Sequence, residues 1–211
     1  RDTSRRPGSM EEILEAFGRG EAQVLVGTQM LSKGHHFPEV TLAIVADADL
    51  GLNLPDYRAT ERTFQLLLQS AGRAGRGEKP GRVLVQTRDI HHFCWEFVKK
   101  GDYIGFYEQE LSLRQKRMYP PFVKLALVRF SFPVHFEQGP MLLNSLAKLL
   151  REKGKQSGVR VLGPAPAPIA LLRGRKRYQC LLKAEDWTAL RRVYAEMLSK
   201  KPSGSEMRVS L

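Results

Sequence analysis

Two arginines stand three residues apart in the segment Gln69-Ser-Ala-Gly72-Arg73-Ala-Gly75-Arg76. At the end of a helix, this spacing makes the side chains of Arg73 and Arg76 project in nearly the same direction. A guanidinium is a permanent, forked cation that suits a phosphate chain and can stabilise charge on a transferred phosphoryl group. The glycines allow another surface to approach the backbone closely. The segment therefore indicates a phosphate-binding pair, and a basic helix end exposed to water is the alternative.

A second polar segment, residues 27–38, follows an apolar run directly. Loops at the carboxyl ends of parallel strands are where α/β proteins place their sites. Thr28 and Gln29 offer neutral donors to phosphate oxygens, Lys33 offers a point charge, and Gly34 leaves room for close backbone contact. The segment predicts a phosphate-facing loop, with an ordinary strand-to-helix loop as the alternative.

A third constellation places four cations around one glycine between two predicted strands, at Arg173, Arg175, Lys176 and Arg177. Such a basic hairpin contacts phosphates without reading sequence, and Tyr178 adds a surface on which a base can stack. The alternative is a solvated tip whose charges keep an edge strand from pairing. We expect this hairpin to bind DNA.

Charge is divided unevenly along the 211 residues, whose 34 lysines and arginines and 22 acids give a net charge of +12. Residues 1–118 hold 17 cations against 16 acids, a net of +1, whereas residues 119–211 hold 17 against 6, a net of +11. A basic surface of that density usually meets a polyanion. The asymmetry predicts two units, of which the second binds nucleic acid.

Metal chemistry has little support in the sequence. Two cysteines, Cys94 and Cys180, cannot form a disulfide scaffold or a four-cysteine zinc site, which favours a reduced, cytoplasmic compartment. We expect Cys94, beside His91 and His92, to be buried in a helical core. The adjacent His35 and His36 lack partners at ligand spacing and are expected to be structural.

One acidic pair imitates a magnesium-binding box. Asp47 and Asp49 end an apolar strand, but no G-x-x-x-x-G-K-[ST] loop accompanies them. We interpret them as strand-end residues near the cleft that the phosphate-binding segments would line, and we predict no metal there.

The first 118 residues must position the two phosphate-binding segments. A helix is predicted over 9–18 with Ser9 as its N-cap. Short apolar runs predict buried strands at 22–27, 41–46 and 81–87, and the run at 41–46 does not alternate, as expected when helices cover both faces. The helix at 58–73 carries Phe64, Leu67, Leu68 and Ala71 on one face, and two more helices are predicted at 91–100 and 102–117. This order is typical of a parallel α/β layer.

The pattern changes after Tyr119-Pro120-Pro121, where neither proline continues a helix. Residues 119–211 predict a small α+β domain with the order strand, helix, strand, strand, helix, strand. Its predicted strands span 122–132, 178–183 and 207–211, its helices span 137–152 and 187–198, and residues 163–168 form a stiff extended connector. We expect Leu142, Leu146, Leu149 and Leu150 to share the buried face of the first helix, and Arg151, Lys153 and Lys155 to extend the basic surface. The first residues lack a signal sequence, and no apolar run reaches the eighteen residues that a bilayer span needs.

These motifs together resemble the PriA family of primosomal replication-restart helicases, in superfamily 2. GTQMLSKGHHFPEV and QLLLQSAGRAGRGEKPGRVLVQT resemble the family's motifs V and VI. RDTSRRPGS resembles the end of motif IV, while YPPF, VLGPAPAPI and RGRKRYQ resemble landmarks of the C-terminal domain. QxxGRxxR occurs in many helicases, whereas GTQMLxKGHHFP is much more specific.

The resemblance implies a RecA-like second helicase lobe followed by a basic α+β DNA-binding domain. Arg73 and Arg76 would reach the phosphates of ATP with Mg²⁺, and Gln69, Gly72 and Gly34 would face the same cleft, whereas Thr28, Gln29 and Lys33 would lie toward DNA. The implied activity is a 3′→5′ DNA helicase that recognises stalled forks and reloads the replicative helicase. Its implied partners are branched and single-stranded DNA, primosome proteins and single-strand-binding protein, with no membrane.

The chain also departs from the family pattern. It has no Walker A loop and no acidic box, and the zinc-binding cysteines would lie upstream of Arg1. We therefore expect a C-terminal fragment that is inactive as an ATPase alone. A stand-alone nucleic-acid-binding protein on a helicase-like scaffold, or an RNA-facing accessory protein, would share these features.

Overall fold

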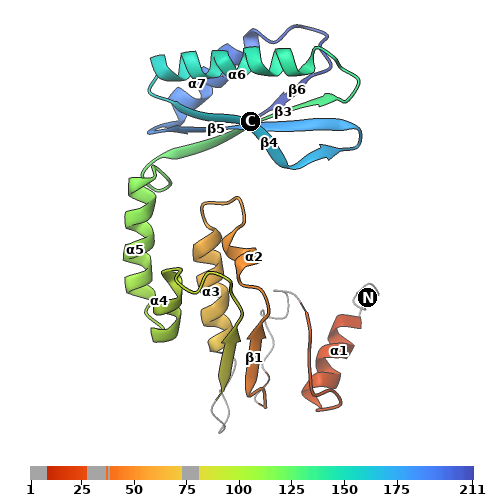
Figure 1. Ribbon diagram of the computed structural model, residues 1–211, viewed down its shortest axis with the longest axis vertical. Helices are drawn as coiled ribbons and strands as arrows, with labels where there is room; N and C mark the ends of the chain where they lie inside the picture. The colour runs from red at the N-terminus through yellow and green to blue at the C-terminus, as the bar shows by residue number, and fades with distance from the viewer. Residues whose placement is uncertain (1–8, 28–36, 38, 73–80) are drawn as a thin grey trace. The chain divides into compact units, whose positions relative to one another are not determined.

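The computed structural model describes residues 9–27, 37, 39–72 and 81–211 (Figure 1). The chain divides into two compact units, Arg1–Tyr107 and Glu108–Leu211. The division falls inside helix α5 (Tyr103–Lys116), whereas the sequence predicts the change of domain at residues 118 and 119.

The first unit contains a parallel pair of strands, β1 (Leu42–Val45) and β2 (Arg82–Val85). Two parallel strands require a connection that returns the chain to the end of the sheet where the first strand starts. Here α2 (Asp49–Leu52) and α3 (Ala59–Ala71) provide that connection. The flanking helices are α1 (Ser9–Gly18) and α4 (Cys94–Lys100), so the predicted parallel α/β arrangement is confirmed.

Helix α3 supplies the centre of the first core. Phe64 and Leu67 are fully buried, and the Phe64 ring stacks on Phe106 of α5 with centroids 3.8 Å apart. Cys94 is buried in the same cluster, as predicted. Ala71 is exposed, because it lies in the last turn, beyond this cluster.

Two predictions for the first unit are wrong. Residues 22–27 form no strand, and Val24 and Val26 are 74% and 87% exposed. A strand needs a ladder partner for its backbone groups, and this segment has none among the described residues. The strands β1 and β2 are also covered on one face only, since exposed and half-buried residues alternate along both. An apolar run alone does not distinguish these arrangements.

The second unit is an antiparallel sheet in the order β4-β5-β3-β6. Its strands are β3 (Lys124–Pro133), β4 (Arg160–Leu172), β5 (Arg175–Ala184) and β6 (Arg208–Ser210). Helices α6 (Gly139–Gln156) and α7 (Trp187–Ser199) both pack on one face of this sheet (Figure 1). The predicted α+β order is therefore confirmed, with α6 and β5 longer than expected.

The core of the second unit follows from strand alternation. Val128 and Phe130 of β3 and Cys180 and Leu182 of β5 point toward the helices and are fully buried. Leu146 and Leu150 of α6 are buried against them, and Leu142 and Leu149 are partly buried beside them, as predicted.

The predicted connector at 163–168 is wrong, because these residues belong to β4. Proline is tolerated in a sheet at an edge strand, where its missing N–H leaves no ladder bond unmade. β4 is such an edge, and its pairing with β5 shifts register between Leu162 and Ala165 and again between Pro166 and Leu171. None of the helices in the described part of the chain combines the length and hydrophobicity that crossing a bilayer requires.

Candidate functional site

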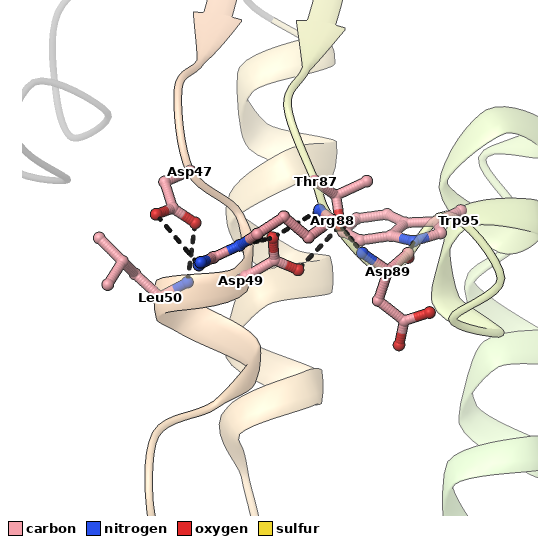
Figure 2. A network of polar contacts seen from close by, with 7 residues as sticks. All are labelled: Asp47, Asp49, Leu50, Thr87, Arg88, Asp89 and Trp95. Atoms are coloured by element: carbon pink, nitrogen blue, oxygen red, sulfur yellow. Dashed lines mark hydrogen bonds and ion pairs between the residues drawn. The ribbon is translucent and has the colours of Figure 1, made fainter.

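The carboxyl ends of β1 and β2 are joined by the buried carboxylate of Asp49 (Figure 2). Thr87 Oγ1 donates to Asp49 Oδ1 at 2.8 Å, and the Arg88 backbone N–H donates to Asp49 Oδ2 at 2.7 Å. The Arg88 guanidinium also donates to Oδ2 through Nε at 3.4 Å. Asp49 begins α2 and Thr87 follows β2, so this carboxylate holds two segments that are 38 residues apart together.

These contacts change the acidity of the group. The hydrogen bond from the Arg88 backbone, followed by that from Thr87, lowers the pKa of Asp49. Asp47 lies next to it, where its carboxylate accepts from the Leu50 N–H at 3.3 Å and lies 3.6 Å from Arg88 Nη2. Asp47 follows the end of β1, whereas Asp49 is the first residue of α2, and the oxygens of both bind donors of the protein itself.

Trp95 fixes the segment that follows Arg88. Its indole N–H donates to the Asp89 carbonyl at 2.6 Å, which ties the start of α4 to the end of β2 (Figure 2). The ring of His92 stacks on Phe93 and its Nδ1 accepts from the Cys94 N–H at 3.3 Å. His92 therefore has a structural place beside Cys94.

The described residues that precede the predicted phosphate-binding pair lie at the opposite end of these strands from Asp49. Helix α3 runs back toward the end of the sheet where β2 begins, and Gly72 is its C-cap. Asp49 lies at the opposite end, after the last residue of β1. Gln69 and Gly72 are exposed at the end of α3, and Gly72 has φ −70°, which any residue adopts. The backbone conformation at Gly72 therefore does not require glycine.

Six predicted site residues lie outside the described residues. They are Thr28, Gln29, Lys33, Gly34, Arg73 and Arg76.

The third predicted constellation is a tight hairpin between β4 and β5. Arg173 and Gly174 form its two-residue loop, with φ values of 51° and 70°. Positive φ at both loop positions is typical of the turn that best matches the twist of paired strands. The other cations do not lie at the tip, because β5 begins at Arg175.

Strand alternation separates these cations onto two faces of the sheet. Arg175 and Arg177 lie on the face opposite α6 and α7, whereas Lys176 and Tyr178 lie on the helical face. Arg175 donates to Ser131 O and to Glu206 O, both at 2.8 Å, so it connects β5 to the chain before β6. The Tyr178 ring stacks on Phe132 with centroids 5.8 Å apart and an interplanar angle of 6°. A protein ring therefore already occupies one face of the tyrosine that we expected to stack on a base.

The structure adds cations that sequence reasoning did not single out. Arg129 of β3 and Arg208 of β6 lie on the same face as Arg177 and are exposed. The signal for Arg129 was available, since it interrupts alternating apolar residues from Ala126 to Phe132 at an outward position. Lys183 also lies on this face but is buried, with its Nζ donating to Arg117 O at 3.0 Å and 3.5 Å from the Tyr119 ring centroid.

Two family profiles match the chain along its length. The profile described as "Helicase conserved C-terminal domain" matches residues 2–78, and "Primosomal protein N C-terminal domain" matches residues 115–211. The replication restart protein PriA of Bacillus subtilis is 42% identical over 197 residues, which are 93% of this chain. The chain belongs to the PriA family. It spans about a quarter of the length of the curated relatives that it matches, 24% for B. subtilis PriA.

Other PriA proteins give the same result. The replication restart protein PriA of Synechocystis is 44% identical over 182 residues, covering 86% of this chain and 22% of that protein. That of Haemophilus influenzae is 38% identical over 196 residues, covering 93% of this chain and 27% of that protein. The two profiles correspond to the parallel α/β unit and the antiparallel α+β unit, which confirms the predicted fold class.

Proposed function

We propose that this chain is the C-terminal part of an ATP-dependent 3′→5′ DNA helicase, which recognises stalled replication forks and restarts replication by primosome assembly. The observation that carries the proposal is the joint match to a helicase domain and a primosomal C-terminal domain in one chain. The non-enzymatic nucleic-acid-binding module remains the alternative that the experiment below decides.

Within this proposal the first unit supplies one wall of an ATP cleft. ATP with Mg²⁺ supplies the phosphoryl group whose hydrolysis drives the motor. Arg73 and Arg76 would neutralise charge on the transferred phosphoryl group, and Gln69, Gly72 and Gly34 would line the same wall. The exposure of Gln69 and Gly72 at the end of α3 supports this, because residues that meet a ligand must be accessible.

DNA would contact both units. Thr28, Gln29 and Lys33 would face the translocating strand, and the basic second unit would hold branched or single-stranded DNA. Primosome proteins and single-strand-binding protein would be the protein partners, in the cytoplasm. A zinc site would belong to upstream sequence.

The test compares the present chain with the full-length protein that contains it. We expect no ATP hydrolysis by the chain alone, with or without DNA, because the Walker A loop is absent from it. In the full-length protein, Arg76→Ala and Arg73→Ala should each reduce DNA-stimulated hydrolysis by roughly 10³-fold or more, the scale of a charge-stabilising arginine.

Binding to a forked DNA should change little in both variants, since these side chains would face nucleotide. Arg82→Ala, an exposed arginine at the start of β2, is the matched control and should leave hydrolysis near the wild-type rate. Hydrolysis within a few-fold of wild type in Arg76→Ala would contradict the role of this arginine. A full-length protein without DNA-stimulated hydrolysis would favour the non-enzymatic alternative.

A further inference from the structure

The four strands of the second unit contain eight lysines and arginines and no acidic residue. All six acids of residues 119–211 lie in helices or loops. Two of them neutralise helical lysines, since Glu152 lies 3.8 Å from Lys148 and Glu196 lies 3.4 Å from Lys153. Most of the net charge of +11 is therefore carried by the eight cations of the strands.

Strand alternation brings most of these cations to one surface. We call the sheet face opposite α6 and α7 the open face. Six of the eight cations lie on it by register: Arg129, Arg160, Arg175, Arg177, Lys183 and Arg208. The fully buried hydrophobic residues of the strands point to the helices instead, while Leu125, Leu127 and Leu181 share the open face with these cations.

Three arginines form the centre of this face. Ser131 of β3 is paired with Arg177 of β5 on one side and with Arg208 of β6 on the other. Arg129, two residues before Ser131, is diagonal to both, and such neighbours lie within about 7–8 Å. No salt bridge in the described part of the chain involves Arg129, Arg177 or Arg208.

Neutral acceptors hold the fourth arginine beside this group. Arg175 donates to Ser131 O and Glu206 O, two backbone carbonyls, so it is fixed without losing its positive charge. The carboxylate of Glu206 is 3.4 Å from His135 Nε2. Like charges on neighbouring strands repel and cost stability, and an anionic ligand would relieve that cost.

The strands contribute no aromatic side chain to the open face, where the ring of Tyr119 lies over Lys183 near the end of β5. The aromatic residues of these strands, Phe130, Phe132 and Tyr178, all lie on the helical face, and Phe132 and Tyr178 stack on each other. The neutral side chains beside the arginines on the open face are Leu127, Ser131, Gln179 and Ser210, and none of them is aromatic. The surface around the arginines therefore offers charge to phosphates and no ring to bases.

We propose that the open face, centred on Arg129, Arg177 and Arg208, is a binding site for the phosphate backbone of DNA. This inference rests on the proposed function and assigns its DNA contact to a surface other than the hairpin tip. Binding depends on phosphates and not on bases. The site therefore holds single strands of any sequence, and removing the bases leaves affinity nearly unchanged.

The experiment measures binding of the whole 211-residue chain to a fluorescein-labelled single strand over a series of salt concentrations. The variant R129Q/R177Q/R208Q should lower affinity and reduce the slope of log affinity against log salt by about 2, since each single-strand phosphate contact contributes roughly 0.7. The matched control is R191Q/R192Q/K200Q, which removes three exposed cations from α7 and its C-cap and leaves the same net charge as the open-face variant. It should retain the wild-type slope to within about half a unit.

Two further comparisons complete the experiment. The first distinguishes an effect of charge from an effect on folding, and the second distinguishes binding through phosphates from binding through bases. R129K/R177K/R208K keeps the charges and should keep most of the slope, whereas an equal loss with lysine and glutamine would mean that the arginines act only on the fold. An abasic strand should bind within about threefold of a normal strand. Strong loss with the abasic strand would overturn the proposal, as would equal slopes for the open-face and control variants. If the wild-type chain binds no DNA even at low salt, the DNA contact of the proposed function fails as well.

Discussion

Gly163 provides a sharp test of how β4 is held against β5. Its φ is +105°, which L side chains rarely adopt, and a Cβ placed there would lie 2.7 Å from the Gln179 carbonyl oxygen of β5. It would also lie 3.3 Å from Cys180 Cα. The obstacles are backbone atoms of a central strand, which cannot rotate away as a flexible side chain would.

We predict that Gly163→Ala destabilises the second unit by about 3 kcal/mol, from roughly 1–3 kcal/mol of backbone strain and a similar cost of overpacking. Gly174→Ala is the matched control, because it lies in the same hairpin with φ +70° but with nothing within 4 Å of the added Cβ. It should cost only the strain, about 1–2 kcal/mol.

Trp187 at the start of α7 allows the second unit to be followed alone. In a Trp95→Phe background, its fluorescence during thermal unfolding reports on this unit, and each kcal/mol should shift the midpoint by roughly 4–8 °C. Gly163→Ala should therefore melt at least about 5 °C below Gly174→Ala. Equal midpoints would show that the backbone contact with Gln179 carries no cost, and would refute the description of this part of β4.

Three other outcomes follow from the contacts above. Asp49→Asn should lower the melting midpoint of the first unit, read from Trp95 fluorescence in a Trp187→Phe background. Because the folded-state pKa of Asp49 is lowered, its stabilisation is complete above the unfolded value of about 4 and is lost as pH falls, so the wild-type advantage should shrink in acid. Tyr178→Ala should cost the second unit about 2 kcal/mol by removing the stack on Phe132, yet leave the salt slope of DNA binding unchanged; a reduced slope would return the tyrosine to the DNA site. Burial raises the pKa of the Cys180 thiol to about 11, so a thiol reagent at neutral pH should modify it only after unfolding, and rapid labelling of the native chain would contradict its burial.

Hydrophobic periodicity was sufficient to predict most elements. The helices α3, α6 and α7 and the strands β1, β2, β3 and β5 all overlap their predicted ranges. Their signals are local, since each depends on residues within a few turns or a few strand positions. Residues 22–27 gave the same apolar signal without forming a strand, because pairing depends on a partner that may lie anywhere in the sequence.

The motifs likewise identified the family from the sequence, because GTQMLSKGHHFPEV and the QSAGRAGR segment are contiguous. Contiguous motifs need no tertiary information. The structural role of Asp49 could not be predicted in this way, because its main hydrogen-bond donors, Thr87 and Arg88, lie 38 and 39 residues further along the chain. Only the parallel pairing of β1 with β2 brings them to one place.

The basic second unit shows most clearly which properties follow from the residue types and which follow from the fold. The residue types alone give the amount of charge, +11 over residues 119–211, and the density of cations around Gly174. The position of that charge on the surface depends on the fold. A strand alternates its side chains between two faces, so consecutive cations in β5 separate, while Arg129, Arg177 and Arg208 from three different strands converge on one face.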